Sequence, residues 1–97
     1  MKSVFISFNQ AFFESIMTIL DKSNIRGYTS FEDVRGRGSR TGVPHFGSHA
    51  WPTMNGAIIT IIEEEKVDSL LEKLQTLDKQ TEALGLRAFV WNIEKMI

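Results

Sequence analysis

Two histidines are the residues of this sequence with the clearest capacity to bind a metal ion. His45 and His49 are the only histidines in the chain, and they lie four residues apart. On a helix this spacing would put both imidazoles on one face, as is common among metal ligands. Gly47 and the neighbouring prolines disfavour a regular helix, so the spacing alone does not define a site. Together with Met54 as a thioether donor, two imidazoles would select a borderline or soft divalent metal or Cu(I).

The same segment has a second interpretation, as a surface that docks on another protein. Phe46 and Trp51 lie beside the histidines, and aromatic side chains on loops frequently anchor interfaces. Arg37, at the basic entry to the segment, would add a charged contact. We place docking ahead of metal binding, and both hypotheses stay open at this point.

Both hypotheses depend on an unusually long loop. Five of the seven glycines, both prolines and both histidines fall between Gly36 and Gly56. No acidic residue occurs between Asp33 and Glu63, whereas arginines stand at positions 35, 37 and 40. Connections of this length without secondary structure are uncommon in compact domains and are usually functional or disordered. We therefore expect a functional loop over residues 35–55.

Composition excludes several classes of protein. The 97-residue chain has no cysteine, which excludes a disulfide framework, a thiolate nucleophile and a cysteine-ligated zinc or iron–sulfur site. Eleven basic residues against twelve acidic ones give a formal net charge of −1, whereas proteins that coat nucleic acid usually carry excess Lys and Arg. The longest apolar run, residues 57–62, is too short to span a bilayer, and no signal peptide is evident. We expect a cytoplasmic protein that binds no nucleic acid and does not insert into the membrane.

Catalysis has little support in the sequence. A hydrolytic triad needs a histidine placed by a rigid scaffold, and both histidines lie in the loop. The glutamates at positions 63–65 are explained by the start of a helix, where carboxylates interact favourably with the helix dipole. We expect a protein that is not an enzyme.

The hydrophobic pattern on either side of the loop predicts four strands and two helices. In chain order these are a strand over residues 4–8, a helix over 12–20 capped by Asn9, a strand over 25–34, a buried strand over 57–62, a helix from residue 63 that Gly85 ends, and a strand over 88–93. This order indicates an α+β, ferredoxin-like βαββαβ sandwich. Its antiparallel four-stranded sheet would carry two helices on one face and the long loop between strands 2 and 3. We expect one domain over residues 1–97, with a core so thin that subunits share it.

Residues 25–38 and 86–91 carry a resemblance to a known family. The second predicted strand and the loop entry contain IRGYT and EDVRGRG, and the last strand reads LRAFVW. Together with the long loop and a helix that begins Val-x-x-Leu-Leu, these segments resemble PII signal-transduction proteins. The resemblance covers most of the chain and implies a homotrimer, a long T-loop that docks on a transporter or an enzyme, and sites for a small effector, such as an adenine nucleotide, between subunits. Some shortened PII-like proteins are associated with metal efflux, which connects the resemblance to the metal hypothesis.

The resemblance also assigns candidate nucleotide-binding residues. The loop base that lines the nucleotide cleft corresponds to Gly36, Gly38, Ser39 and Arg40. The second wall corresponds to Thr81, Gly85 and Arg87, with arginine in place of the family's lysine. Glycines let backbone N–H groups approach phosphate, and arginine supplies charge-assisted hydrogen bonds. The family's basic C-terminal segment has no expected counterpart, and a trimer that binds no ligand stays an alternative.

Overall fold

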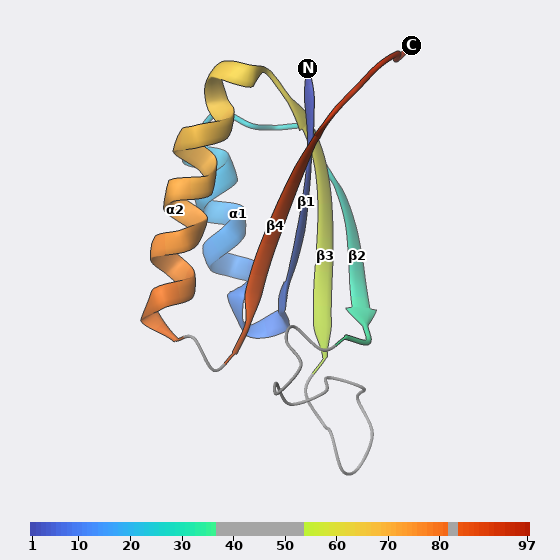
Figure 1. The fold of residues 1–97 in the computed structure, drawn as a ribbon. Helices are drawn as coiled ribbons and strands as arrows, with labels where there is room; N and C mark the ends of the chain where they lie inside the picture. Colours follow the sequence, from blue (N-terminus) through green and yellow to red (C-terminus); the bar gives the residue numbers. More distant parts are fainter. Residues whose placement is uncertain (37–53, 82–83) are drawn as a thin grey trace.

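The computed structural model describes residues 1–36, 54–81 and 84–97. Its elements are β1 (Lys2–Asn9), η1 (Gln10–Phe12), α1 (Phe13–Lys22), β2 (Thr29–Val34), β3 (Asn55–Ile62), η2 (Glu64–Lys66), α2 (Val67–Gln80) and β4 (Leu86–Asn92). The strands form one antiparallel sheet in the order β2-β3-β1-β4, and both helices lie on one side of it (Figure 1). The predicted βαββαβ sandwich is therefore confirmed. None of the helices in the described ranges is long and apolar enough to cross a membrane.

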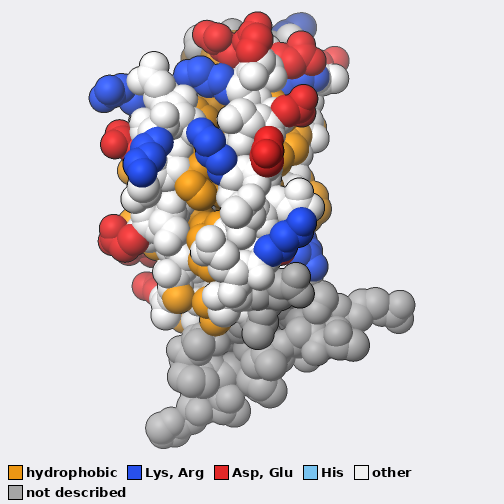
Figure 2. Space-filling view, turned by 90° about the vertical axis from the view of Figure 1, so that its left-hand side faces the viewer, with side chains coloured by type: hydrophobic (Ala, Val, Ile, Leu, Met, Phe, Trp, Pro, Cys, Tyr) orange, Lys and Arg blue, Asp and Glu red, His pale blue; other side chains and the backbone are white. Residues whose placement is uncertain are grey.

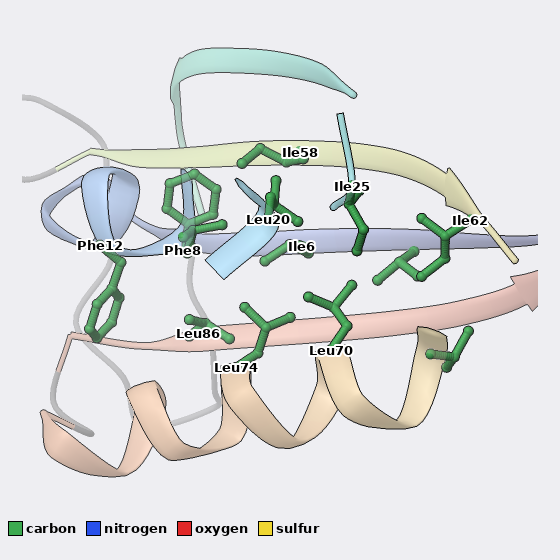
Figure 3. Packing of buried hydrophobic residues seen from close by; sticks show 13 residues of the cluster. Ile6, Phe8, Phe12, Leu20, Ile25, Ile58, Ile62, Leu70, Leu74 and Leu86 are labelled. Atoms are coloured by element: carbon green, nitrogen blue, oxygen red, sulfur yellow. The ribbon is translucent and has the colours of Figure 1, made fainter. Parts of the chain in front are cut away.

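The hydrophobic core fills the space between the sheet and the two helices. Val4, Ile6 and Phe8 alternate along β1 on the side of the helices and are at most 1% exposed. Leu20 from α1 and residues of α2 close the core from the other side (Figure 3). Because full burial of one such side chain contributes about 1.5–3 kcal/mol, this single layer carries most of the stability of the chain.

The connection from β1 to α1 is held by Asn9, as predicted. Its side-chain Oδ1 accepts a hydrogen bond of 2.9 Å from the backbone N–H of Ala11. The turn that Asn9 caps is the 3₁₀ helix η1, which runs directly into α1 at Phe13. Short 3₁₀ turns of this kind are frequent at the start of α-helices.

The prediction that the second strand starts at Ile25 is wrong, because β2 starts at Thr29. Asn24 has a φ of 56°, in the left-handed region, which ends the helical path of α1. Ile25 is then buried in the core, and its backbone N–H donates to the carbonyl oxygen of Leu20 at 2.9 Å. These contacts hold Ile25 against α1 and outside the sheet.

The prediction that Gly85 ends the second helix is also wrong. Helix α2 ends at Gln80, and Thr81 follows in a non-helical conformation. Gly85 has a φ of 86° and lies in the turn that enters β4. Glycine adopts such a positive φ at the least steric cost, so the residue serves a turn as expected, but not the one at the helix end.

Strand β3 is longer than predicted, and it is not buried on both faces. It begins at Asn55 instead of residue 57, and Ile61 is exposed. Ile61 lies opposite Ser3 on β1, so it points away from the helix-covered face that carries Val4 and Ile6. The Ile-rich run therefore supplies apolar side chains to both faces of the sheet, but the described chain covers only one of them.

Candidate functional site

Two consecutive backbone amides join the turn before β4 and the residue before β3 at one end of the sheet. The N–H of Asn9 donates to the carbonyl oxygen of Gly85 at 3.0 Å, in the turn before β4. The N–H of Gln10 donates to the carbonyl oxygen of Met54 at 3.0 Å, directly before β3. The end of β1 thus joins the turn into β4 to the place where the chain returns from the long loop (Figure 1). Of these residues, the family resemblance assigned only Gly85 to the nucleotide site, together with the loop entry from Gly36 to Arg40.

The loop base on the side of β2 is shaped by a bulge and a close approach of two chain segments. The register between β2 and β3 shifts between Phe31 and Val34, and Asp33 has a φ of 54°. Gly36 follows, and a Cβ atom on it would lie 2.7 Å from Nδ2 of Asn55. A side chain at position 36 would require the amide of Asn55 to shift, so glycine suits the geometry of the loop base.

The second wall contains Thr81, Gly85 and Arg87, which the structure places between the end of α2 and the start of β4. The N–H of Thr81 donates to the carbonyl oxygen of Asp78 at 3.2 Å, and its own carbonyl accepts from Leu84 at 3.1 Å. These bonds form the turn that leads to Gly85. Arg87 stands in β4, one residue after the strand begins.

Arg87 is the candidate residue in the described chain that can bind an anion by charge. Its side chain is 53% exposed, and its Nη1 donates to the carbonyl oxygen of Leu86 at 3.0 Å. The same nitrogen lies 3.8 Å from Oδ2 of Asp78 on α2. A guanidinium group can give a phosphate two parallel charge-assisted hydrogen bonds, so Arg87 is chemically suited to the predicted role.

A hollow of about 330 Å³ beside the loop base does not suit a phosphate. Glu14 from α1 and Glu32 and Asp33 from β2 line it. Their carboxylates would repel an anion. Within residues 1–36, 54–81 and 84–97, no group of three or more His, Asp or Glu side chains is arranged to hold a metal ion.

Most of the predicted loop contacts lie outside the described residues. These are the nucleotide candidates Gly38, Ser39 and Arg40, the metal candidates His45 and His49, and the docking candidates Arg37, Phe46 and Trp51. Nucleotide, metal and partner binding by these side chains stay predictions.

The sequence analysis missed the extent of the apolar surface on the open face, the face of the sheet opposite the helices. The strand registers place four large side chains that are 36–55% exposed on this face: Phe31, Ile61, Phe89 and Trp91. Alternation in β4 was a usable signal, since Phe89 and Trp91 are two residues apart and so share a face. Asp78 was missed as well, because its contact with Arg87 depends on a turn that no local pattern predicts.

Comparisons with known proteins agree with this architecture. The family model described as Nitrogen regulatory protein P-II matches residues 1–97. No curated protein matches the chain. The structure of CPII, a nitrogen regulatory PII-like protein from Thiomonas intermedia K12, bound to ADP, AMP and bicarbonate, is 28% identical with a TM-score of 0.74 over 95% of this chain and 88% of that chain.

Two further structures extend the comparison. CPII bound to ADP and bicarbonate is 29% identical, with a TM-score of 0.76 over 95% of this chain and 84% of that chain. A protein from Thermus thermophilus described as PII-like shares the fold at 23% identity, with a TM-score of 0.66 over 95% and 85% of the two chains. Since the family model spans all 97 residues, the resemblance is confirmed: the chain belongs to the nitrogen regulatory protein P-II family, whose members are regulators and not enzymes.

Proposed function

We propose that this PII-like protein is a homotrimer that binds an adenine nucleotide at the loop end of the sheet and docks its long loop on a protein partner. One observation carries the proposal. The adjacent amides of Asn9 and Gln10 hold Gly85 and Met54, so the turn before Arg87 and the end of the loop share one anchor. A ligand bound beside this anchor can favour one loop conformation by binding it better than another.

The nucleotide assignment is supported by Arg87 and by the relatives. Arg87 presents a half-exposed cation next to the glycine turn, where a phosphate could meet both the guanidinium and backbone N–H groups. The CPII structures are described as bound to ADP and, in one case, to AMP as well. We therefore infer that ADP or AMP, rather than a nucleic acid, is the effector class.

The homotrimer is supported by the open face of the sheet. Phe31, Ile61, Phe89 and Trp91 give it exposed apolar area that association with further copies would remove from water. The side covered by the helices differs, since charged side chains are spread over it and hydrophobic ones form only a narrow band (Figure 2). Members of the family are typically trimers that bind protein targets. The open face is therefore the surface through which we expect copies of this chain to pack.

The loop over residues 35–55 is the proposed docking segment, with Arg37, Phe46 and Trp51 as its contacts. Gly36 at its start lies close to the side chain of Asn55, and the carbonyl of Met54 at its end accepts from the N–H of Gln10. A transporter or an enzyme is the proposed partner. Docking by aromatic side chains on a loop of fixed ends requires no catalytic group in the protein itself.

Calorimetric titration with ADP, AMP and ATP tests the nucleotide assignment. Arg87→Ala should weaken ADP binding about tenfold, which is the loss of one charge-assisted contact of ~1.4 kcal/mol. Arg26→Ala is the matched control, because Arg26 is an exposed arginine in the connection after α1, outside the proposed site. Equal affinity in Arg87→Ala and the native protein would remove Arg87 from the site, and absence of heat with all three nucleotides would reject the effector.

Bicarbonate is a second candidate effector, because the CPII structures are described as bound to bicarbonate as well as to ADP. We propose that it acts together with the nucleotide and not in its place. ADP titrations with and without bicarbonate, at constant pH and ionic strength, should then give different ADP affinities. Identical affinities would argue against bicarbonate as a co-effector.

A further inference from the structure

Asp78 occupies a position that stability alone does not explain. It lies in the last turn of α2, and its side chain is 22% exposed. Its Oδ2 is 3.8 Å from Nη1 of Arg87. Its Oδ1 is buried and has no hydrogen-bond partner among the described residues. One oxygen of the Asp78 carboxylate thus makes a long ion-pair contact with Arg87, and the other accepts no hydrogen bond within the described residues.

Two effects make this position costly for a carboxylate, and the contact with Arg87 offsets little of the cost. The C-terminal end of a helix carries partial negative charge, which disfavours a carboxylate there. A buried oxygen without a hydrogen-bond donor loses its hydration without replacement. The contact with Arg87 recovers little, because charge-assisted N–H···O bonds are about 2.7–2.9 Å long and the observed separation is 3.8 Å. A neutral side chain would avoid the repulsion at the helix end and would be less costly to bury.

The surroundings leave the Arg87 side chain room to move. A hollow of about 320 Å³ lies between α2 and β4, lined in part by Gln75, Asp78, Leu86 and Arg87. The guanidinium is tied down only by the 3.0 Å bond to the carbonyl of Leu86 and by the long contact with Asp78, as far as the described residues go. It can therefore exchange partners without breaking a strong interaction.

We propose that Asp78 competes with the anionic ligand for Arg87 and so lowers the affinity of the site and its preference for highly charged nucleotides. This inference rests on the proposed nucleotide function and names the residue that regulates it. In the structure, the guanidinium of Arg87 lies on the side of Asp78 at the start of β4. A phosphate accepts two short hydrogen bonds from the guanidinium, which then leaves Asp78. Asp78 opposes this exchange because its carboxylate attracts Arg87 and repels the phosphate.

The consequence for regulation is a site that stays unsaturated over a wider range of ligand concentration. Asp78 also links the exchange to the rest of the second wall, because its carbonyl oxygen accepts from the N–H of Thr81 at 3.2 Å. Movement of Asp78 after Arg87 departs would act on the turn that contains Gly85. Asp78 is in this view a positioning residue, which acts through Arg87.

The test is a double-mutant cycle on the full chain, with ADP and AMP as probes in calorimetric titrations. Asp78→Asn keeps the size of the side chain and should tighten ADP binding about fivefold, as expected for one partly screened charge pair. The gain should be larger for ADP than for AMP, which carries less charge. In the Arg87→Ala background, Asp78→Asn should give a clearly smaller gain, because only the repulsion between Asp78 and the phosphate is then removed.

Asp68→Asn is the matched control. Asp68 is an exposed aspartate in the first turn of the same helix, so its substitution changes the net charge equally at the far end of α2. It should alter ADP affinity less than about twofold, because screening limits charge effects over such a distance. Asp78→Ser, which also removes the charge, serves if Asp78→Asn does not fold.

Each outcome decides the proposal. Equal ADP affinity in native protein and Asp78→Asn overturns the role of Asp78 while the nucleotide function stands. The same gain with and without Arg87 also overturns it, since Asp78 would then act on the ligand by charge alone. If neither the native protein nor the Asp78 variants bind ADP or AMP, the proposed function itself fails and this inference fails with it.

Discussion

The two faces of the sheet both carry large apolar side chains but have opposite surroundings. On the helix-covered face, Val4, Ile6 and Phe8 are almost completely buried by α1 and α2. On the open face, Phe89 and Trp91 are about half exposed within the described chain. An apolar side chain in a strand therefore does not by itself indicate a core position. One face of the sheet stabilises the single chain, and the other is the surface on which the proposed trimer would pack.

Phe8→Ala should give the largest effect, because it opens a cavity in the covered face. The expected loss is about 3–5 kcal/mol of unfolding free energy, independent of protein concentration. Urea unfolding followed by circular dichroism measures it. Phe5→Ala is the matched control, since Phe5 lies on the same strand but on the open face and is only partly buried. Equal losses for the two variants at low protein concentration would contradict the distinction between the faces.

Phe89→Glu should prevent copies of the chain from packing through the open face without unfolding the chain. A charge at the centre of an apolar interface removes an anchor of about 2–4 kcal/mol and cannot be buried unpaired. We expect a trimer mass for the native protein and a monomer mass for the variant by light scattering, with the circular dichroism spectrum retained. Ser69→Glu, on the exposed side of α2, should stay trimeric. A monomeric native protein would refute the proposed assembly outright.

Gly56→Ala tests how tightly the covered face is packed. A Cβ atom at this position would lie 2.7 Å from Cζ of Phe8, whose ring is buried in the core. The expected cost is about 1–3 kcal/mol of unfolding free energy in a chemical denaturation experiment. Gly27→Ala provides the comparison, because nothing lies within 4 Å of a Cβ there. Similar losses of unfolding free energy in Gly56→Ala and Gly27→Ala would mean that the ring of Phe8 can move aside.

Thr60→Val should give the smallest effect and concerns a polar side chain that β3 contributes to the covered face. Thr60 is 1% exposed, and its Oγ1 donates to the carbonyl oxygen of Gly27 at 2.6 Å. Valine has a similar shape, so the variant loses about 1 kcal/mol for one hydrogen bond and little packing. Thermal unfolding of the two proteins side by side checks this. A loss of unfolding free energy above about 3 kcal/mol would show that this hydrogen bond stabilises more of the structure than the segment between α1 and β2.

The fold could be predicted from the sequence because its elements are strongly periodic. The alternation through Val4, Ile6 and Phe8 and the apolar spacing of α2 both identify their elements directly. The ends of the strands and helices were harder to predict from the sequence where tertiary contacts determine them. Ile25 looks like a strand residue, but the core and its bond to Leu20 hold it outside the sheet.

The candidate site was only partly accessible from the sequence. Gly36, Gly85 and Arg87 could be named from the family resemblance, and the structure brings their elements to one end of the sheet. The partnership of Asp78 with Arg87 could not be foreseen, because it joins a helix end to a strand start across a turn. The exposed state of Ile61 depends equally on strand order, which a run of isoleucines does not encode.

The anchor at the end of β1 has a consequence for how freely the loop can change. Asn9 and Gln10 hold their two partners through backbone carbonyls, at Gly85 and Met54, so the bonds impose no side-chain requirement on the acceptors. The two donors are neighbours along a chain of fixed covalent geometry, which limits how far the two attachments can move apart. The Met54 attachment lies at the end of the long loop and does not depend on the loop sequence, so residues 37–53 can be inserted, deleted or exchanged while the frame persists. The loop is therefore a place where partner specificity can diversify, or be engineered, at little risk to folding.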